Sequence, residues 1–511
     1  MAIELEKGSL NINQIIAQKY ESDVIDGDCI VPDTKPDILG IIETSGVISI
    51  YKKEVLDGKV RIEGSVNAYV MYLGDDGKTK TARSISHSLD FSQIINVDNA
   101  TSEMLLMSNS SLQKIECKVI NERKLSIQAT VNHNIKIFTN SNVEFINNAN
   151  ISDMQKLENT VTVNSLVGSG NSKSNAKETI QIDKTENLAE IMKVNTEIIN
   201  KDIKISYNKI LTKADVRIKI LYSTEEGRIN SVSKTIPMVG FIDMQGINEK
   251  NLCDTEMEIN NIIIKPNSTQ DHSIYVELEM EMMAITYETK EINVIQDLYS
   301  PSMNLEFEQT NIKAIQNKAK FEGKFNINQT ETLNIGDEKV YDVDSRIFIN
   351  DAKSFNDECD ISGTVTCTFI HSINSMTGIS INRIDIPFEY KMPCKGILAN
   401  SQMNISYELE NDDFNIMPGG DVDVNLNINF SIESSNEINI SMINNITESK
   451  TNSQNDYNMV IYFTKSDDSL WNIAKRFKST TDIIINENSI ENENILPGTQ
   501  LFISKYIGAN G

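Results

Sequence analysis

The sequence predicts a mainly β fold, in which three tandem antiparallel β-sandwich-like repeats precede a small βααβ module. Three observations support this prediction: a residue pattern recurs along the chain, long runs alternate apolar with polar residues, and the segment 460–504 changes to helical spacing. Period-two alternation places one face of a strand on a core and the other in water. The alternating runs therefore indicate half-buried antiparallel strands.

The repeat is visible in three segments, 65–91, 215–241 and 364–388. Each segment begins with an alternating run, passes a polar turn containing glycine and returns as a second run, which is the pattern of a β-hairpin. The matching positions are Val66, Tyr72, Gly77 and Phe91; then Val216, Tyr222, Gly227 and Phe241, each 150 residues later; then Val365, His371, Gly378 and Phe388. We therefore expect three copies of one unit.

A further alternating strand closes the later copies, at 276–282 and 422–432. Two polar stretches, 166–179 and 444–458, contain too few apolar residues to repay the entropy of ordering, so we expect linkers there. The expected organisation is an N-terminal segment 1–24, β repeats at 25–150, 176–300 and 308–443, a linker at 444–457 and a module at 458–506.

The formal charge of −26 argues against nucleic acid and anionic membrane surfaces as partners, and it leaves a basic partner open. The N-terminus has neither a basic region nor an apolar run typical of a secretory signal. No stretch approaches the roughly 20 apolar residues that span a bilayer. Six cysteines without paired spacing are typical of reduced thiols, so we expect a cytoplasmic protein.

The segment "VPDTKPDI", residues 31–38, combines two prolines with two aspartates. Together with the repeats and the C-terminal module, this motif resembles the SPOCS domain family of spore-coat-associated proteins of spore-forming Gram-positive bacteria. The resemblance covers residues 25–445 at the level of repeat architecture. The second and third copies lack the motif, so equivalent function across the copies is an open question.

The segment 460–504 resembles a LysM domain over its whole length. A short strand precedes Asp468, which we expect to cap a helix, and Thr481 is expected to cap a second helix. In the first helix four apolar residues recur at the spacing of one buried face. They are Leu470, Ile473, Ala474 and Phe477.

In LysM domains the ligand groove lies between the loop after the first strand and the loop after the second helix. The resemblance implies a partner-binding groove at Lys465, Ser466, Asp467, Asp468, Leu470, Trp471, Asn488, Ser489, Ile490 and Leu496. Trp471, the single tryptophan, lies at the edge of the apolar stripe. Bracing of the first loop and direct contact with a partner are two open interpretations of this residue.

The sequence shows no catalytic constellation, so we expect no enzyme, no cofactor and no metal site. His133 lies on an apolar strand face, as a core histidine does. Cys367 and His371 are about 13 Å apart on an extended strand, too far to share one ion. Asp33 and Asp37 supply too few oxygen ligands for a cation.

The first functional hypothesis is a spore coat morphogenetic scaffold in the mother-cell cytoplasm, located at the forespore surface. The resemblance implies that its LysM domain docks on a SpoIVA-type ATPase of the coat basement layer. The body would recruit other coat proteins or associate with itself, since several linked domains favour multivalent assembly. The alternative is a peptidoglycan-binding protein of the cell wall or spore cortex.

Overall fold

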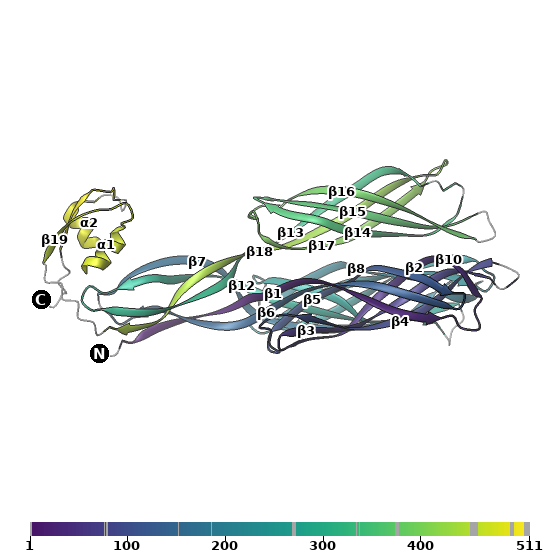
Figure 1. Cartoon of the computed structure of the whole chain (residues 1–511), viewed down its shortest axis with the longest axis horizontal. Helices are drawn as coiled ribbons and strands as arrows, with labels where there is room; N and C mark the ends of the chain where they lie inside the picture. Colours follow the sequence, from purple (N-terminus) through teal and green to yellow (C-terminus); the bar gives the residue numbers. More distant parts are fainter. Residues whose placement is uncertain are drawn as a thin grey trace.

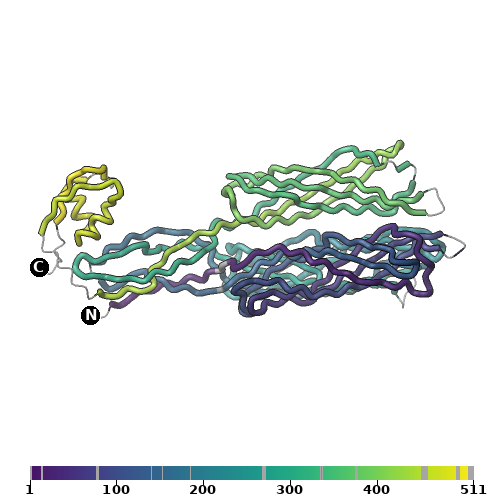
Figure 2. Tube along the Cα trace, viewed as in Figure 1, coloured from purple at the N-terminus to yellow at the C-terminus, as the bar shows by residue number. Residues whose placement is uncertain are grey.

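The computed structural model describes residues 3–504, apart from 76, 78–79, 152, 185, 268–271, 334, 337, 374–377, 450–457 and 491–494. It is a mainly β protein with an elongated body and a small module at one end (Figure 1). The start of β1 (Leu5–Ile30) lies at the same end of the molecule as the module (Figure 2).

The body contains three units of six strands with one topology. The first unit is β1, β2 (Asp37–Leu56), β3 (Lys59–Asp75), β4 (Lys80–Asn96), β5 (Leu105–Asn121) and β6 (Lys124–Ala149). The second is β7 (Gln155–Gln181), β8 (Leu188–Ser206), β9 (Lys209–Thr224), β10 (Ile229–Asp243), β11 (Leu252–Pro266) and β12 (Ser273–Tyr299). The third is β13 (Leu305–Thr332), β14 (Val340–Phe355), β15 (Glu358–Ser372), β16 (Ile379–Pro393), β17 (Gln402–Ile416) and β18 (Asp421–Glu448).

Each unit pairs its strands into two antiparallel three-stranded sheets, ordered β2-β3-β4 and β1-β6-β5 in the first unit. The alternating residues build the core between the sheets, as the sequence predicts. Val276, Leu278, Met280 and Met282 of β12 are all fully buried, as are the corresponding residues of β18 from Val422 onward. The fold class is confirmed as antiparallel three-stranded sheets followed by a βααβ segment.

The first and last strands of each unit continue beyond the sandwich as a two-stranded ribbon. The three ribbons pack together into a six-stranded stalk, seen where β7, β12 and β18 extend toward the module (Figure 1). Equivalent residues of the three ribbons share its core: Ile146, Ile295 and Ile443 form one layer, and Ala149, Leu298 and Ile446 another. The stalk therefore joins all three units around a pseudo-threefold axis.

The sandwiches also meet on this axis. Met71, Leu221 and Ile370, which occupy the same position in β3, β9 and β15, belong to one buried apolar cluster. Beside them Lys193 of the second unit forms an ion pair of 2.8 Å with Asp342 of the third. Both side chains are 3% exposed, so this pair is buried between units.

The expected linker at 166–179 is wrong, because these residues lie in β7 and pair with β12. The small residues of this segment let β7 pack closely against β10, since a Cβ on Gly170 would come within 2.6 Å of the Ile242 side chain. In the second expected linker, residues 444–448 continue β18, whereas 450–457 fall outside the described residues. Strand β1 runs through the boundary expected at residue 24, whereas β6 and β12 end next to the limits expected at 150 and 300.

The predicted alignment of the three repeats is correct at the hairpin glycine and wrong at the phenylalanine position of the second repeat. Gly77, Gly227 and Gly378 all have φ near 80° in equivalent hairpins. However, Val66 pairs with Leu89 and Val216 with Ile236, so the second hairpin is three residues shorter. Phe241 consequently points outward and is 57% exposed, whereas Phe91 and Phe388 are buried. Met238 takes the equivalent inward position in the second unit.

Candidate partner-binding site

The C-terminal module consists of β19 (Met459–Phe463), α1 (Leu470–Phe477), α2 (Thr481–Asn488) and β20 (Gln500–Ser504). The two strands pair antiparallel, with Ile461 opposite Phe502. The predicted helical stripe is confirmed, since Leu470, Ile473 and Ala474 are buried and Phe477 packs against the same cluster.

Both helix caps lie one residue from the expected positions. Ser469 caps α1 by accepting from the backbone N–H of Asn472, and Thr480 caps α2 by accepting from that of Ile483. Asp468 instead closes the first loop, where its Oδ2 accepts from the Lys465 N–H at 2.8 Å and from the Tyr462 hydroxyl at 2.7 Å. These donors stabilise the carboxylate and lower the pKa of Asp468.

The ten predicted groove residues separate into four groups, of which Trp471 forms the last. Lys465, Ser466, Asp467, Ser489 and Leu496 are exposed and form the open rim, with Asp468 and Ile490 half-buried beside them. Leu470 is only 5% exposed and belongs to the core. The Asn488 amide holds α2 to β20, because it donates to the Phe502 carbonyl and accepts from the Phe502 N–H, both at 2.7 Å.

Trp471 points toward the body and not toward the rim. Its Nε1 donates a 2.7 Å hydrogen bond to Oδ2 of Asp297 at the end of β12, and the other Asp297 oxygen pairs with Lys475 Nζ at 2.5 Å. The Tyr299 ring meets the Trp471 ring edge to face, with centroids 5.0 Å apart. The contact therefore joins one helix of the module to the tip of the stalk.

Further contacts extend the same interface. The Tyr299 hydroxyl donates to the Ser479 carbonyl at 3.0 Å, and Lys478 Nζ donates to Asn304 Oδ1 at 2.8 Å. Tyr299 is 6% exposed, and this burial raises the pKa of its hydroxyl. Sequence reasoning missed Asp297 and Tyr299, since they lie at the end of an ordinary alternating strand far from the module in sequence.

The module and the first two units match known families. A model described as SipL, SPOCS domain, matches residues 37–120 and 187–267, and a LysM domain model matches 462–504. The chain therefore contains SPOCS domain sequence in its first two units and a LysM domain at 462–504. Neither a curated protein nor a solved structure matches the chain. SPOCS and LysM domains are binding domains, and the matched families include no enzyme.

The matched SPOCS segments lie in the first and second units, from β2 to β5 and from the start of β8 to just past β11. The third unit repeats the same strand order. In the part of the chain that the structure describes, no helix is long and apolar enough to cross a membrane. Within that same part, no group of three or more His, Cys, Asp or Glu side chains has the arrangement of a metal site.

The VPDTKPDI segment connects β1 to β2, and hydrogen bonds and an ion pair from Arg123 hold its conformation. The Arg123 guanidinium donates to the carbonyls of Val31, Pro32 and Lys35 and pairs with Asp37 at 3.0 Å. Lys35 Nζ then reaches Glu190 of the second SPOCS unit at 2.7 Å. The motif therefore shapes a turn that links two units, and its aspartates pair with arginine.

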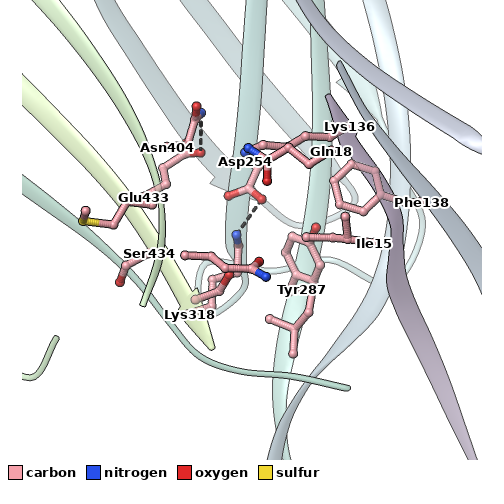
Figure 3. A pocket seen from close by; sticks show the side chains of 14 residues that line it. Ile15, Gln18, Lys136, Phe138, Asp254, Tyr287, Lys318, Asn404, Glu433 and Ser434 are labelled. Carbon is pink, nitrogen blue, oxygen red and sulfur yellow. Dashed lines mark hydrogen bonds and ion pairs between the residues drawn. The ribbon is translucent and has the colours of Figure 1, made fainter. Parts of the chain in front are cut away.

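Where the three ribbons separate into sandwiches, side chains from all three units surround a small cavity of about 30 Å³ (Figure 3). Asp254 of the second unit pairs with Lys318 of the third at 2.5 Å, and Lys318 also lies 4.7 Å from the centre of the Tyr287 ring. Burial, reinforced by Asp254, raises the pKa of Glu433 to about 7. This layer is a polar contact between units with room for little more than a water molecule.

A larger cavity of about 610 Å³ lies between the three sandwiches. Val47, Glu197 and Arg346 occupy equivalent positions in β2, β8 and β14 and line it together. Burial raises the pKa of Glu197 to about 7, against the opposing influence of Arg217. The polar walls are largely paired within the protein, as with Glu258, which binds Lys53 at 2.9 Å.

Proposed function

We propose that this protein is a non-enzymatic spore coat morphogenetic scaffold of the mother-cell cytoplasm, which localises coat around the forespore. Its LysM domain docks on the SpoIVA-type ATPase of the basement layer. The observation that carries the proposal is the union, in one chain, of SPOCS units with a LysM domain. Other coat proteins would bind the three-unit body, whose elongated shape presents a large surface.

The charged and apolar side chains of the LysM rim support a protein ligand over a neutral glycan. Asp467 is exposed at the first loop, beside Lys465 and across from Ser489 and Leu496. Leu496 is 77% exposed, so it presents apolar surface at the rim that a protein partner could bury. Peptidoglycan binding through the same rim is the second candidate, because glycan recognition is the function that LysM resemblance implies.

One experiment separates the two candidates. The full-length chain is titrated with a purified SpoIVA-type ATPase and, in parallel, sedimented with purified peptidoglycan. Leu496→Glu tests the rim, and Leu398→Glu, a change at an exposed leucine of the body, is the matched control. We expect saturable ATPase binding that falls at least tenfold in Leu496→Glu alone. Saturable sedimentation with peptidoglycan and no ATPase binding would overturn the proposal.

A further inference from the structure

The face formed by Trp471 and Lys475 of α1 and by the C-cap residue Lys478, called the α1 face below, is already occupied by a segment of the body. Three side chains at the stalk tip fill it: Asp297, Tyr299 and Asn304. We propose that this α1 face is a recognition site for an extended segment of the form Asp-x-Tyr, which the chain's own stalk tip occupies until a protein partner presents the same chemistry.

Asp297 and Tyr299 contribute different interactions to the α1 face, the first electrostatic and the second aromatic. Asp297 uses both carboxylate oxygens, one on the Trp471 indole N–H and one on the Lys475 ammonium, so the site selects an anion with two acceptors. Hydrogen bonds to charged groups are the stronger ones in such interfaces. Tyr299 adds an aromatic edge on Trp471 and a hydroxyl donor to the Ser479 carbonyl.

The strand geometry explains the spacing of the two determinants. Residues two apart on an extended strand point to the same side, so Asp297 and Tyr299 both reach the module. Leu298 between them points to the other side and lies in the stalk core at 1% exposure. The middle residue of the segment therefore makes no contribution to the α1 face.

The three equivalent ribbon tips differ in the side chains that they offer to the module. Ala149, Leu298 and Ile446 are structurally equivalent core residues of the three tips. The residues that flank them are Asn148 and Asn150 in the first unit, Asp297 and Tyr299 in the second, and Asn445 and Thr447 in the third. Of the described tips, that of the second unit offers a carboxylate and a phenol ring together, and both contact the LysM domain. The third unit contributes Phe307, whose ring centre lies 5.4 Å from Lys475 Nζ.

This inference rests on the proposed function for its partner, since a partner in trans must displace the tethered segment. An intramolecular segment competes at a high effective concentration, commonly in the millimolar range for short tethers. A partner can reach Trp471 only if it presents Asp-x-Tyr on an exposed strand or tail and so replaces the stalk tip. The docked stalk tip thus limits binding to partners of that class.

The single tryptophan makes the test direct, because all indole emission of the full-length chain comes from Trp471. Asp297→Lys places a cation against Lys475 and should release the module, so that emission shifts to longer wavelength and acrylamide quenches it several-fold more. Glu308→Lys, at an exposed carboxylate of β13, is the matched control and should leave the emission unchanged. The charge swap Asp297→Lys with Lys475→Asp should restore the emission only in part, because it re-forms the ion pair but leaves the Trp471 indole N–H without an acceptor.

Synthetic peptides then test recognition in trans on the released Asp297→Lys chain. A peptide of residues 293–301 should reverse the emission shift in a saturable manner. The same peptide with Leu298→Lys should act equally well, whereas Asp297→Asn or Tyr299→Ala should weaken it at least tenfold. Equal binding of all four peptides, or no binding, would overturn the inference. An unshifted Asp297→Lys emission would also overturn it, while ATPase binding by the same preparation would leave the proposed function standing.

Discussion

The indole N–H of Trp471 donates a 2.7 Å hydrogen bond to Asp297, a residue 174 positions earlier in the chain. This bond places the LysM domain on the stalk tip formed by the second SPOCS unit. Of the two interpretations that the sequence left open for Trp471, neither included a contact with the body. The LysM domain is therefore packed against the protein that carries it.

Removal of the LysM domain should weaken the stalk and spare the sandwiches. Truncation after residue 449 exposes Tyr299, which is 6% exposed in the full chain and packs in the LysM core cluster. The three sandwich cores contain no LysM residue. Hydrogen exchange should accelerate in the outer halves of β12 and β13 and stay unchanged in β3, β9 and β15. Collapse of exchange protection throughout the body would contradict this expectation.

Lys193→Ala should destabilise the junction between the second and third units. The change leaves Asp342 and Asp344 buried without their ammonium partner, and loss of one member of a buried pair commonly costs about 3 to 5 kcal/mol. Lys219, which also reaches Asp342, should keep the loss near the lower figure. Urea unfolding measures the effect. Lys177→Ala, at an exposed ion pair, is the control and should change little.

The stability of the body should decline as pH rises through about 7. Burial raises the pKa of Glu197 and of Glu433 to about 7 in the folded protein, above the ordinary glutamate value. Between the unfolded and the folded pKa, the folded chain binds more protons than the unfolded chain. The two carboxyl groups therefore contribute their full stabilisation below the unfolded pKa, and this stabilisation is lost as pH rises through the folded pKa. Thermal unfolding from pH 5 to 8 should show a Tm that falls up to about pH 7 and then levels off, and Glu433→Gln should flatten the fall. A Tm that rises over this range would refute the assignment.

Two equivalent glycines should not tolerate alanine. A Cβ on Gly64 would come within 2.5 Å of the Ser49 carbonyl oxygen, and one on Gly363 within 2.4 Å of the Phe348 carbonyl oxygen. Backbone atoms cannot move aside, so each change should cost about 1–3 kcal/mol by overpacking. Ala214 occupies the equivalent position in the second unit, opposite the flexible Met238. Ala214→Gly is therefore the control, and a smaller loss at Gly64 than at Ala214 would argue against the close approach.

Arg123→Lys should loosen the VPDTKPDI turn although it keeps the charge. A lysine has one donor group and cannot reach the carbonyls of Val31, Pro32 and Lys35 together. We expect a loss of about 2 kcal/mol, the usual size for hydrogen bonds to a charged group. The amides of Val31 and Ile38, which bond to residues 123 and 122, should exchange faster. Unchanged exchange at both amides would show that Arg123 does not fasten the turn.

Alternation and helical spacing predicted most of the local structure, because both patterns report which side chains face a core. The strands at 276–282 and 422–432 and the buried face of α1 follow directly from them. Segment 166–179 was missed because its small residues serve close packing against Ile242, a contact that composition does not reveal. The Asp297–Trp471 contact was missed because it depends on how three ribbons assemble, and no local pattern records that assembly.

The most direct test of the scaffold proposal is the affinity of the full-length chain for a purified SpoIVA-type ATPase, measured with and without Asp297→Lys. If this partner, besides the rim, also engages the α1 face that the stalk tip covers, release of the stalk tip should tighten binding by about tenfold or more, because the competing segment is gone. Absence of ATPase binding by both chains, with each correctly folded, would contradict the account.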